Sequence, residues 1–180
     1  MYRSALMTAG IYDAEVKVAA PFAVSGTAAL TGVYKAYEAI TGTELVEEAK
    51  EAAADEPVVT AELADEVEDD ADAVAIVNDM KLMLDETEDM TDEELQTEIE
   101  DIADDYGYTL DQELIDKLID LCRSMEGLSI ADIQEKVQEF KDTVETVSEY
   151  ANQAITFGQK FAAFIQKVVA AFQNVFGSGE

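Results

Sequence analysis

The chain has 180 residues, of which 48% are hydrophobic, and its 41 acidic and 11 basic side chains give a formal net charge of −30. The apolar fraction is large enough for a packed core, which argues against wholesale disorder, and the charge argues against binding to nucleic acid. Histidine is absent and there is one cysteine. These counts exclude Ser-His-Asp and Cys-His catalysis, the HExxH zinc site and an intramolecular disulfide.

The charge is unevenly distributed along the chain. Residues 1–43 contain equal numbers of acids and bases, residues 44–149 contain nearly all the acids, and only Lys160, Lys167 and Glu180 are charged after that. The acidic middle either forms solvated helix faces or attracts cations or a basic partner, and composition leaves both open. No signal peptide opens the chain, and no uncharged apolar run reaches the roughly 20 residues that span a bilayer.

The N-terminal region is expected to form a helix, a strand and a second helix. Residues 2–9 read as a short helix ended by Gly10, and residues 14–20 (AEVKVAA) alternate as a strand does. Ser25 can cap a helix that Gly42 closes. The strand needs a partner, and no second convincing strand follows. Either another chain supplies that partner or an N-terminal region of the native protein is absent, and we favour the absent region.

The acidic middle of the chain is expected to be helical throughout. A first helix covers residues 45–54 and ends before Pro57, because the residue before a proline disfavours helix. Thr60 can cap a second helix, and a third is expected over residues 73–84.

A helical hairpin is expected to follow. Thr91 and Glu94 form a capping box, and Gly107 and Gly127 end the two helices. The apolar positions at helical spacing are Leu95, Ile99, Ile102, Tyr106, Leu110, Leu114, Leu118, Leu121, Cys122 and Met125.

The C-terminal segment carries a heptad seam from Ile130 to Val175. As one helix it would extend roughly 70 Å at 1.5 Å per residue, with a bend expected near Gly158. Core packing or self-association is favoured over an interfacial membrane helix, because the polar face has few lysines. The residues expected to form the interaction surface are Phe157, Phe161, Phe164, Ile165, Val168 and Phe172.

Two single residues are candidates for reactive groups. Ser25, in AVSGT, lacks the glycine of a nucleophile elbow, so capping is favoured over catalysis or anion binding. Cys122 lies in phase with apolar neighbours, which favours a buried and inert thiol over a reactive one.

The acidic clusters raise the question of calcium. None matches the spacing of an EF-hand loop, so only weak cation binding is open to them. The candidate ligands are Asp69, Asp70, Asp72, Asp104 and Asp105. Paired carboxylates allow a glycosidase by residue type, but tryptophan, a common platform for sugars, is absent. We expect no catalytic residue, no cofactor and no firm metal site.

The run AGIYDAEVKVAAPFAVSGTAALTGVYKAYE, together with TDEELQTEIEDIADDYGYTLDQELIDKLIDL, resembles a bacterial family catalogued as domain of unknown function 1002. The resemblance implies an exported protein of Gram-positive bacteria, with a signal peptide and a β-containing region ahead of this motif. It therefore implies that the present chain is truncated, or is the product of a shortened gene. It implies no activity and no catalytic residues.

The expected fold is mainly α, a helical bundle with a helix-strand-helix unit at its start and a long heptad helix at its end. It would be α+β if the strand pairs. The expected segments are residues 1–43, 44–129 and 130–180. The favoured function is that of an exported or envelope-associated, non-enzymatic protein that acts through helical interaction surfaces, with a protein partner or a second copy. The alternatives are an enzyme or carbohydrate-active module with its site in an absent N-terminal region, and a weak calcium binder.

Overall fold

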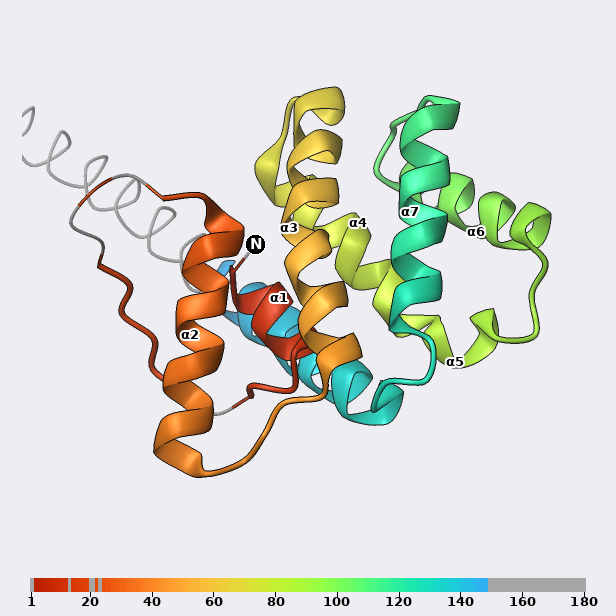
Figure 1. Cartoon of the computed structure of the whole chain (residues 1–180). Helices are drawn as coiled ribbons and strands as arrows, with labels where there is room; N and C mark the ends of the chain where they lie inside the picture. Colours follow the sequence, from red (N-terminus) through yellow and green to blue (C-terminus); the bar gives the residue numbers. More distant parts are fainter. Residues whose placement is uncertain (1, 13, 20–21, 23, 149–180) are drawn as a thin grey trace, which may run out of the picture. The chain divides into compact units, whose positions relative to one another are not determined.

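The structure is a computed structural model that describes residues 2–12, 14–19, 22 and 24–148 (Figure 1). Its internal contacts divide the chain into one unit of residues 1–138 and another of residues 139–180. The described residues are mainly helical, which confirms the predicted class, and residues 130–148 are helical as well. The first unit contains α1 (Tyr2–Thr8), α2 (Gly26–Thr41), α3 (Glu47–Val67), α4 (Asp70–Leu82), α5 (Leu84–Thr87), α6 (Asp92–Asp105) and α7 (Gln112–Met125).

The long helix α3 organises the first unit, because it packs against α1, α2, α4 and α7 (Figure 1). The main core lies among α3, α4, α6 and α7, and a smaller one joins α1, α2 and α3. Burial of a leucine-sized side chain stabilises a fold by roughly 1.5–3 kcal/mol. The side chains of the main core that solvent does not reach are Leu63, Ala73, Ile76, Leu84, Leu95, Ile99 and Leu118.

Several helix ends lie where the local sequence predicts them. The α2 helix begins after Ser25, whose hydroxyl accepts a hydrogen bond from the Ala28 amide, and it ends at Gly42 with φ +69°. A left-handed residue of this kind favours glycine, which has no Cβ to clash. The predicted capping box is also confirmed, because Thr91 and Glu94 bond reciprocally at the start of α6.

The predicted break at Pro57 is wrong. The α3 helix runs through this proline from Glu47 to Val67, although a proline in a helix interior costs about 3 kcal/mol or more. Burial on one face outweighs that cost, since Glu56, Thr60 and Leu63 are each at most 3% exposed. Thr60 is not a cap either, because its hydroxyl donates within the helix to the Glu56 carbonyl at 2.7 Å.

The third predicted helix is displaced and divided. Residues 73–84 were expected to be helical, but α4 begins at Asp70 because Asp69 caps it, accepting from the amides of residues 71 and 72. The α4 helix ends at Leu82, and the short α5 follows from Leu84.

The predicted strand over residues 14–20 is not formed. Its described part, residues 14–19, is irregular, and no strand occurs in the part of the chain that the structure describes. A strand needs hydrogen bonds from a neighbouring edge, and the described residues provide none here. In place of the predicted helix-strand-helix unit, the described residues form two helices with the irregular residues 14–19 between them.

The heptad seam is described only up to residue 148. Ile133 and Val137 are buried and pack with Met7 of α1, whereas Val144 and Val147 are more than half exposed. The six residues predicted as an interaction surface, from Phe157 to Phe172, lie outside the described residues, so that prediction stays untested.

Candidate functional site

The irregular segment of residues 14–19 is the most unusual feature of the first unit. Within the described residues, its backbone N–H and C=O groups have no hydrogen-bond partner. An unpaired row of backbone groups on an alternating sequence is a template for another strand. The segment therefore has the chemistry of an open sheet edge.

A groove of about 640 Å³ lies between this segment and α2. Small residues on α2 keep it open, since Ala28, Gly32 and Ala36 all line it and recur every four residues. A spacing of four places side chains on one face of a helix. The apolar side chains that line the groove more fully are Ile11, Val16, Val18, Val24, Val33, Tyr37 and Ile40.

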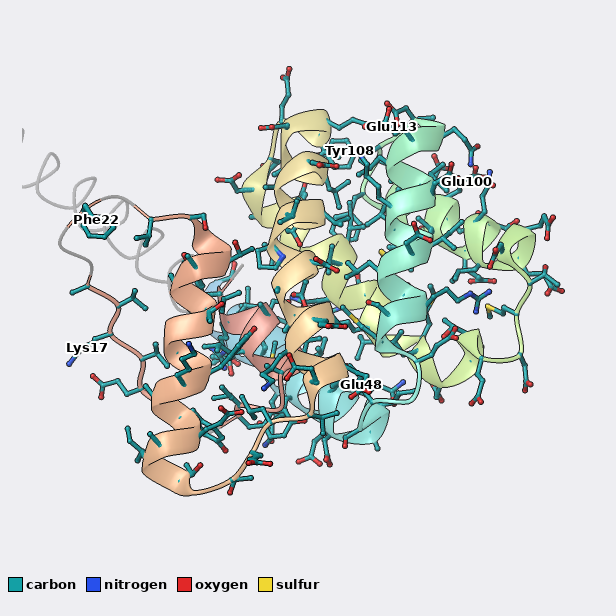
Figure 2. All side chains as sticks on the ribbon, viewed as in Figure 1. Lys17, Phe22, Glu48, Glu100, Tyr108 and Glu113 are labelled. Atoms are coloured by element: carbon teal, nitrogen blue, oxygen red, sulfur yellow. The ribbon has the colours of Figure 1, made fainter. Side chains whose placement is uncertain are left out.

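Large apolar side chains are exposed around the groove. Val18 is 53% exposed, Phe22 72% and Ile40 84%. Figure 2 shows the side chain of Lys17 pointing away from α2, and Phe22 on the stretch of chain that precedes this helix. Single exposed apolar residues are normal on a soluble protein, but a cluster of them indicates an interaction site. This cluster lies in the part of the sequence whose charges balance, in a chain of net charge −30.

A second group of polar side chains is buried beneath α1. The ammonium of Lys81 donates to Glu56 Oε1 at 2.8 Å, to the Ser4 hydroxyl at 2.8 Å and to the Ser4 carbonyl at 3.2 Å. The Ser4 hydroxyl donates to Asn78 at 2.8 Å, and Thr8 donates to Glu56 Oε2 at 2.6 Å. These five residues form one network that joins α1, α3 and α4.

The geometry of the network indicates a structural role, that of holding α1 against α3 and α4. All three ammonium protons of Lys81 have acceptors, and each of the five residues is at most 4% exposed. Burial lowers the pKa of Lys81, and the Glu56 carboxylate opposes that change. Ser4 lies beside a lysine, as in some serine hydrolases, but a general base must reach a bound substrate, and this lysine is enclosed.

Tyr34 lies close to this network without joining it. Its hydroxyl is buried and has no hydrogen-bond partner within the described residues. Burial and the negative charge of Glu56 raise the pKa of Tyr34 to about 12. The hydroxyl therefore stays protonated at neutral pH.

The predicted cation ligands occupy two neighbouring regions. Asp69 caps α4, Asp70 lies in the first turn of that helix, and Asp72 accepts a hydrogen bond from the Tyr108 hydroxyl at 2.7 Å. Asp104 and Asp105 lie at the end of α6. In the described part of the chain, no three potential metal-ligating side chains come together. Weak cation binding by these residues stays a prediction.

The two candidate reactive residues, Ser25 and Cys122, have structural roles. The Ser25 hydroxyl caps α2, accepting from the Ala28 amide at 3.2 Å. Cys122 is buried, and that burial raises the pKa of its thiol to about 12, with a further contribution from Glu126.

Sequence reasoning missed both the network and the groove. One signal for the network was available, since Lys81 falls between Val77 and Leu84 at spacings of four and three on an otherwise apolar face. A lysine in such a position needs a buried partner. The signal for the groove was the period of four among the small residues of α2.

Residues 1–147 match the family described as protein of unknown function DUF1002. The chain belongs to this family. It is also 32% identical over 178 residues to the uncharacterized protein YpuA of Bacillus subtilis (strain 168), in an alignment that covers 98% of this chain. The chain spans 61% of the length of that relative. No solved structure matches the chain.

The groove and the network both lie within the residues that match the family. Across the described residues, no helix combines the length and the apolar character needed to cross a membrane.

Proposed function

We propose that this family member is a non-enzymatic interaction protein that binds a protein partner through the groove between residues 14–19 and α2. The observation that carries the proposal is an apolar groove beside a backbone edge that has no partner among the described residues. A protein partner that binds such an edge adds a strand of its own to it through backbone hydrogen bonds. Pockets that take every second side chain of this strand provide specificity.

The composition of the groove fits a protein partner. Interface cores are depleted in charge and enriched in apolar and aromatic groups, and Val33, Tyr37 and Ile40 provide such a surface on α2. Covering exposed apolar area contributes roughly 25 cal/mol per Å². Ile40, which lines the groove at 84% exposure, has the most to gain from a partner there.

The ionisable groups of the first unit support a binding role over a catalytic one. Lys81 and Cys122, whose pKa values are shifted by burial, are enclosed in the protein, and the part-exposed Lys117, whose pKa is raised, is held by ion pairs with Glu62 and Glu113. An active site instead combines such groups with a cavity that admits substrate. The groove is such a cavity, but the charged residues among its described lining, Glu15 and Lys17, pair with each other at 2.7 Å.

A second proposal is that a longer protein containing this chain is an enzyme or a carbohydrate-active module. The relative from Bacillus subtilis exceeds this chain in length, so an enzyme or carbohydrate-active module could be completed by residues that this chain does not span. Export from the cell, or attachment to the envelope, belongs to the first proposal. Fractionation of cells that express the native gene checks it, with the protein expected outside the cytoplasm.

Site-specific photo-cross-linking in the producing cells tests the groove. A photoreactive residue replaces Ala36, which is exposed and lines the groove, or Ala39, which is exposed on the same helix but does not line it. Position 36 is expected to give a protein adduct of defined mass that position 39 does not give. Equal adducts from both positions, or none from position 36, would overturn the proposal.

A further inference from the structure

The charge pattern of residues 14–18 is self-complementary in one alignment only. If two copies pair antiparallel with Val16 opposite Val16, then Glu15 of each copy faces Lys17 of the other, and Ala14 faces Val18. Opposite charges facing each other across two strands stabilise the pair. We propose that the partner at this edge is a second copy of this chain, paired in this register. The inference rests on the proposed function, because it names the occupant of the groove.

Neighbouring alignments are disfavoured by the same residues. Moving the antiparallel register by two residues places Glu15 opposite Glu15 or Lys17 opposite Lys17, and a parallel in-register pair does both. Like charges directly opposite each other are destabilising. A slip of one residue would bring apolar residues of one copy opposite charged residues of the other and mix the two faces. The proposed register has neither defect.

The two charged side chains are available for exchange between copies. Lys17 and Glu15 form an ion pair within one chain at 2.7 Å, and their side chains are 87% and 80% exposed. An exposed pair of this kind contributes little to stability. Exchanging the ion pair within one chain for the same pair between two copies therefore costs little. Glu15 of each copy then pairs with Lys17 of the other, as a two-fold axis requires.

Electrostatics also favours this end of the chain for self-association. The chain carries a net charge of −30, yet residues 1–43 balance, with Arg3, Lys17 and Lys35 against Asp13, Glu15 and Glu38. Two copies that met through their acidic helices would repel each other. Contact through the balanced segment avoids that repulsion and covers the exposed valines, Val16 and Val18.

The test is sedimentation equilibrium of the whole chain over a wide concentration range, at about 0.15 M NaCl. The wild type is expected to dimerise. Lys17→Glu gives two Glu–Glu contacts per dimer and Glu15→Lys gives two Lys–Lys contacts, so each single variant should dimerise roughly 10–100-fold more weakly. Lys35→Glu changes the net charge as Lys17→Glu does, at an exposed residue outside the groove lining, and should dimerise like the wild type.

Mixing the two weakened variants gives the sharpest outcome. An equimolar mixture of Lys17→Glu and Glu15→Lys restores both ion pairs and should associate as tightly as the wild type, as should the double variant Glu15→Lys/Lys17→Glu. A monomeric wild type, or a dimer that none of these changes weakens, would overturn the proposed pairing. If the chain is monomeric and position 36 still cross-links to a different protein, the proposed function stands and only the second copy is ruled out.

Discussion

Lys81 of α4 and Glu56 of α3 form an ion pair of 2.8 Å in which each side chain is only 2% exposed. Ser4 and Thr8 of α1 complete the hydrogen bonds of this pair. The short α1 helix is thus held by polar contacts in addition to its apolar ones. Because α1 leads through residues 10–12 into the irregular segment, the pair also helps to fix where one wall of the groove begins.

Replacing Lys81 with methionine should be strongly destabilising. The change leaves Glu56 buried without its counter-ion, and the loss of one partner of a buried pair typically costs about 3–5 kcal/mol. Urea denaturation followed by circular dichroism measures the free energy of unfolding. A loss below about 1 kcal/mol would show that the pair is not enclosed as described.

Adding Glu56→Leu to Lys81→Met should restore much of that loss. Two apolar side chains of similar size remove the uncompensated charge, and such replacements of buried pairs are often neutral or stabilising. The double variant is therefore expected to be more stable than Lys81→Met alone in the same urea experiment. Losses that simply add would contradict the coupling between the two side chains.

Tyr34→Phe should stabilise the protein. The tyrosine hydroxyl is buried and has no partner among the described residues, and an unsatisfied buried polar group costs about 1–3 kcal/mol. Thermal or urea unfolding should show a gain of about 1 kcal/mol. Tyr108→Phe is the control, because it removes a hydrogen bond to Asp72 and should be destabilising. A clear loss of stability in Tyr34→Phe would mean that its hydroxyl has a partner.

The thiol of Cys122 should be unreactive in the folded protein. Burial raises its pKa to about 12, and only the thiolate reacts readily with thiol reagents. Labelling at about pH 8 should require unfolding.

The same group gives a pH dependence of stability. The pKa of the Cys122 thiol in the folded protein lies above the ordinary value of 9.0. The contribution of this thiol to the free energy of unfolding is therefore complete below about pH 9 and is lost as the pH rises toward 12. Cys122→Ala should lack this component of the alkaline loss of stability. Rapid labelling of the native protein at about pH 8 would contradict both expectations.

Removal of the cap at the start of α6 should have a moderate effect. Thr91→Ala takes away the acceptor for the Glu94 amide at 3.2 Å, and loss of such a cap costs about 1 kcal/mol. The hydrogen bond that the Thr91 backbone amide donates to Glu94 lowers the pKa of that carboxyl below 4.5. The contribution of the Glu94 carboxylate to the stability of the folded protein is therefore present above about pH 4.5 and is lost as the pH falls below that value. Glu94→Gln should flatten this part of the acid dependence, and an unchanged profile would contradict the reciprocal cap.

Local chemistry made part of the fold predictable. The turn residue Gly42, the cap Ser25 and the capping box at Thr91 each act within a few residues of the chain, and the structure has them where the sequence places them. The helical phase that Cys122 shares with its apolar neighbours predicts a buried thiol, and the structure confirms the burial.

Features that depend on distant residues were not predictable in this way. The α3 helix continues through Pro57 because α1, α4 and α7 pack along it, and packing can override a local preference. The pairing of Glu56 with Lys81 joins residues far apart in sequence. The alternation of residues 14–20 predicted a strand that the described residues 14–19 do not form, since a strand also needs a partner that the described residues do not supply.

Hydrogen exchange at the edge segment tests the central claim, that residues 14–19 form a pairing edge for a second copy of this chain. Unpaired backbone amides exchange rapidly, and pairing with another strand protects them. Exchange is compared at about 1 µM and about 500 µM protein, with the peptide from α7 as an internal control. We predict that the amides of residues 14–19 exchange promptly in the dilute protein and become protected in the concentrated one, while α7 is unchanged. Equal, rapid exchange of residues 14–19 at both concentrations would contradict pairing with a second copy.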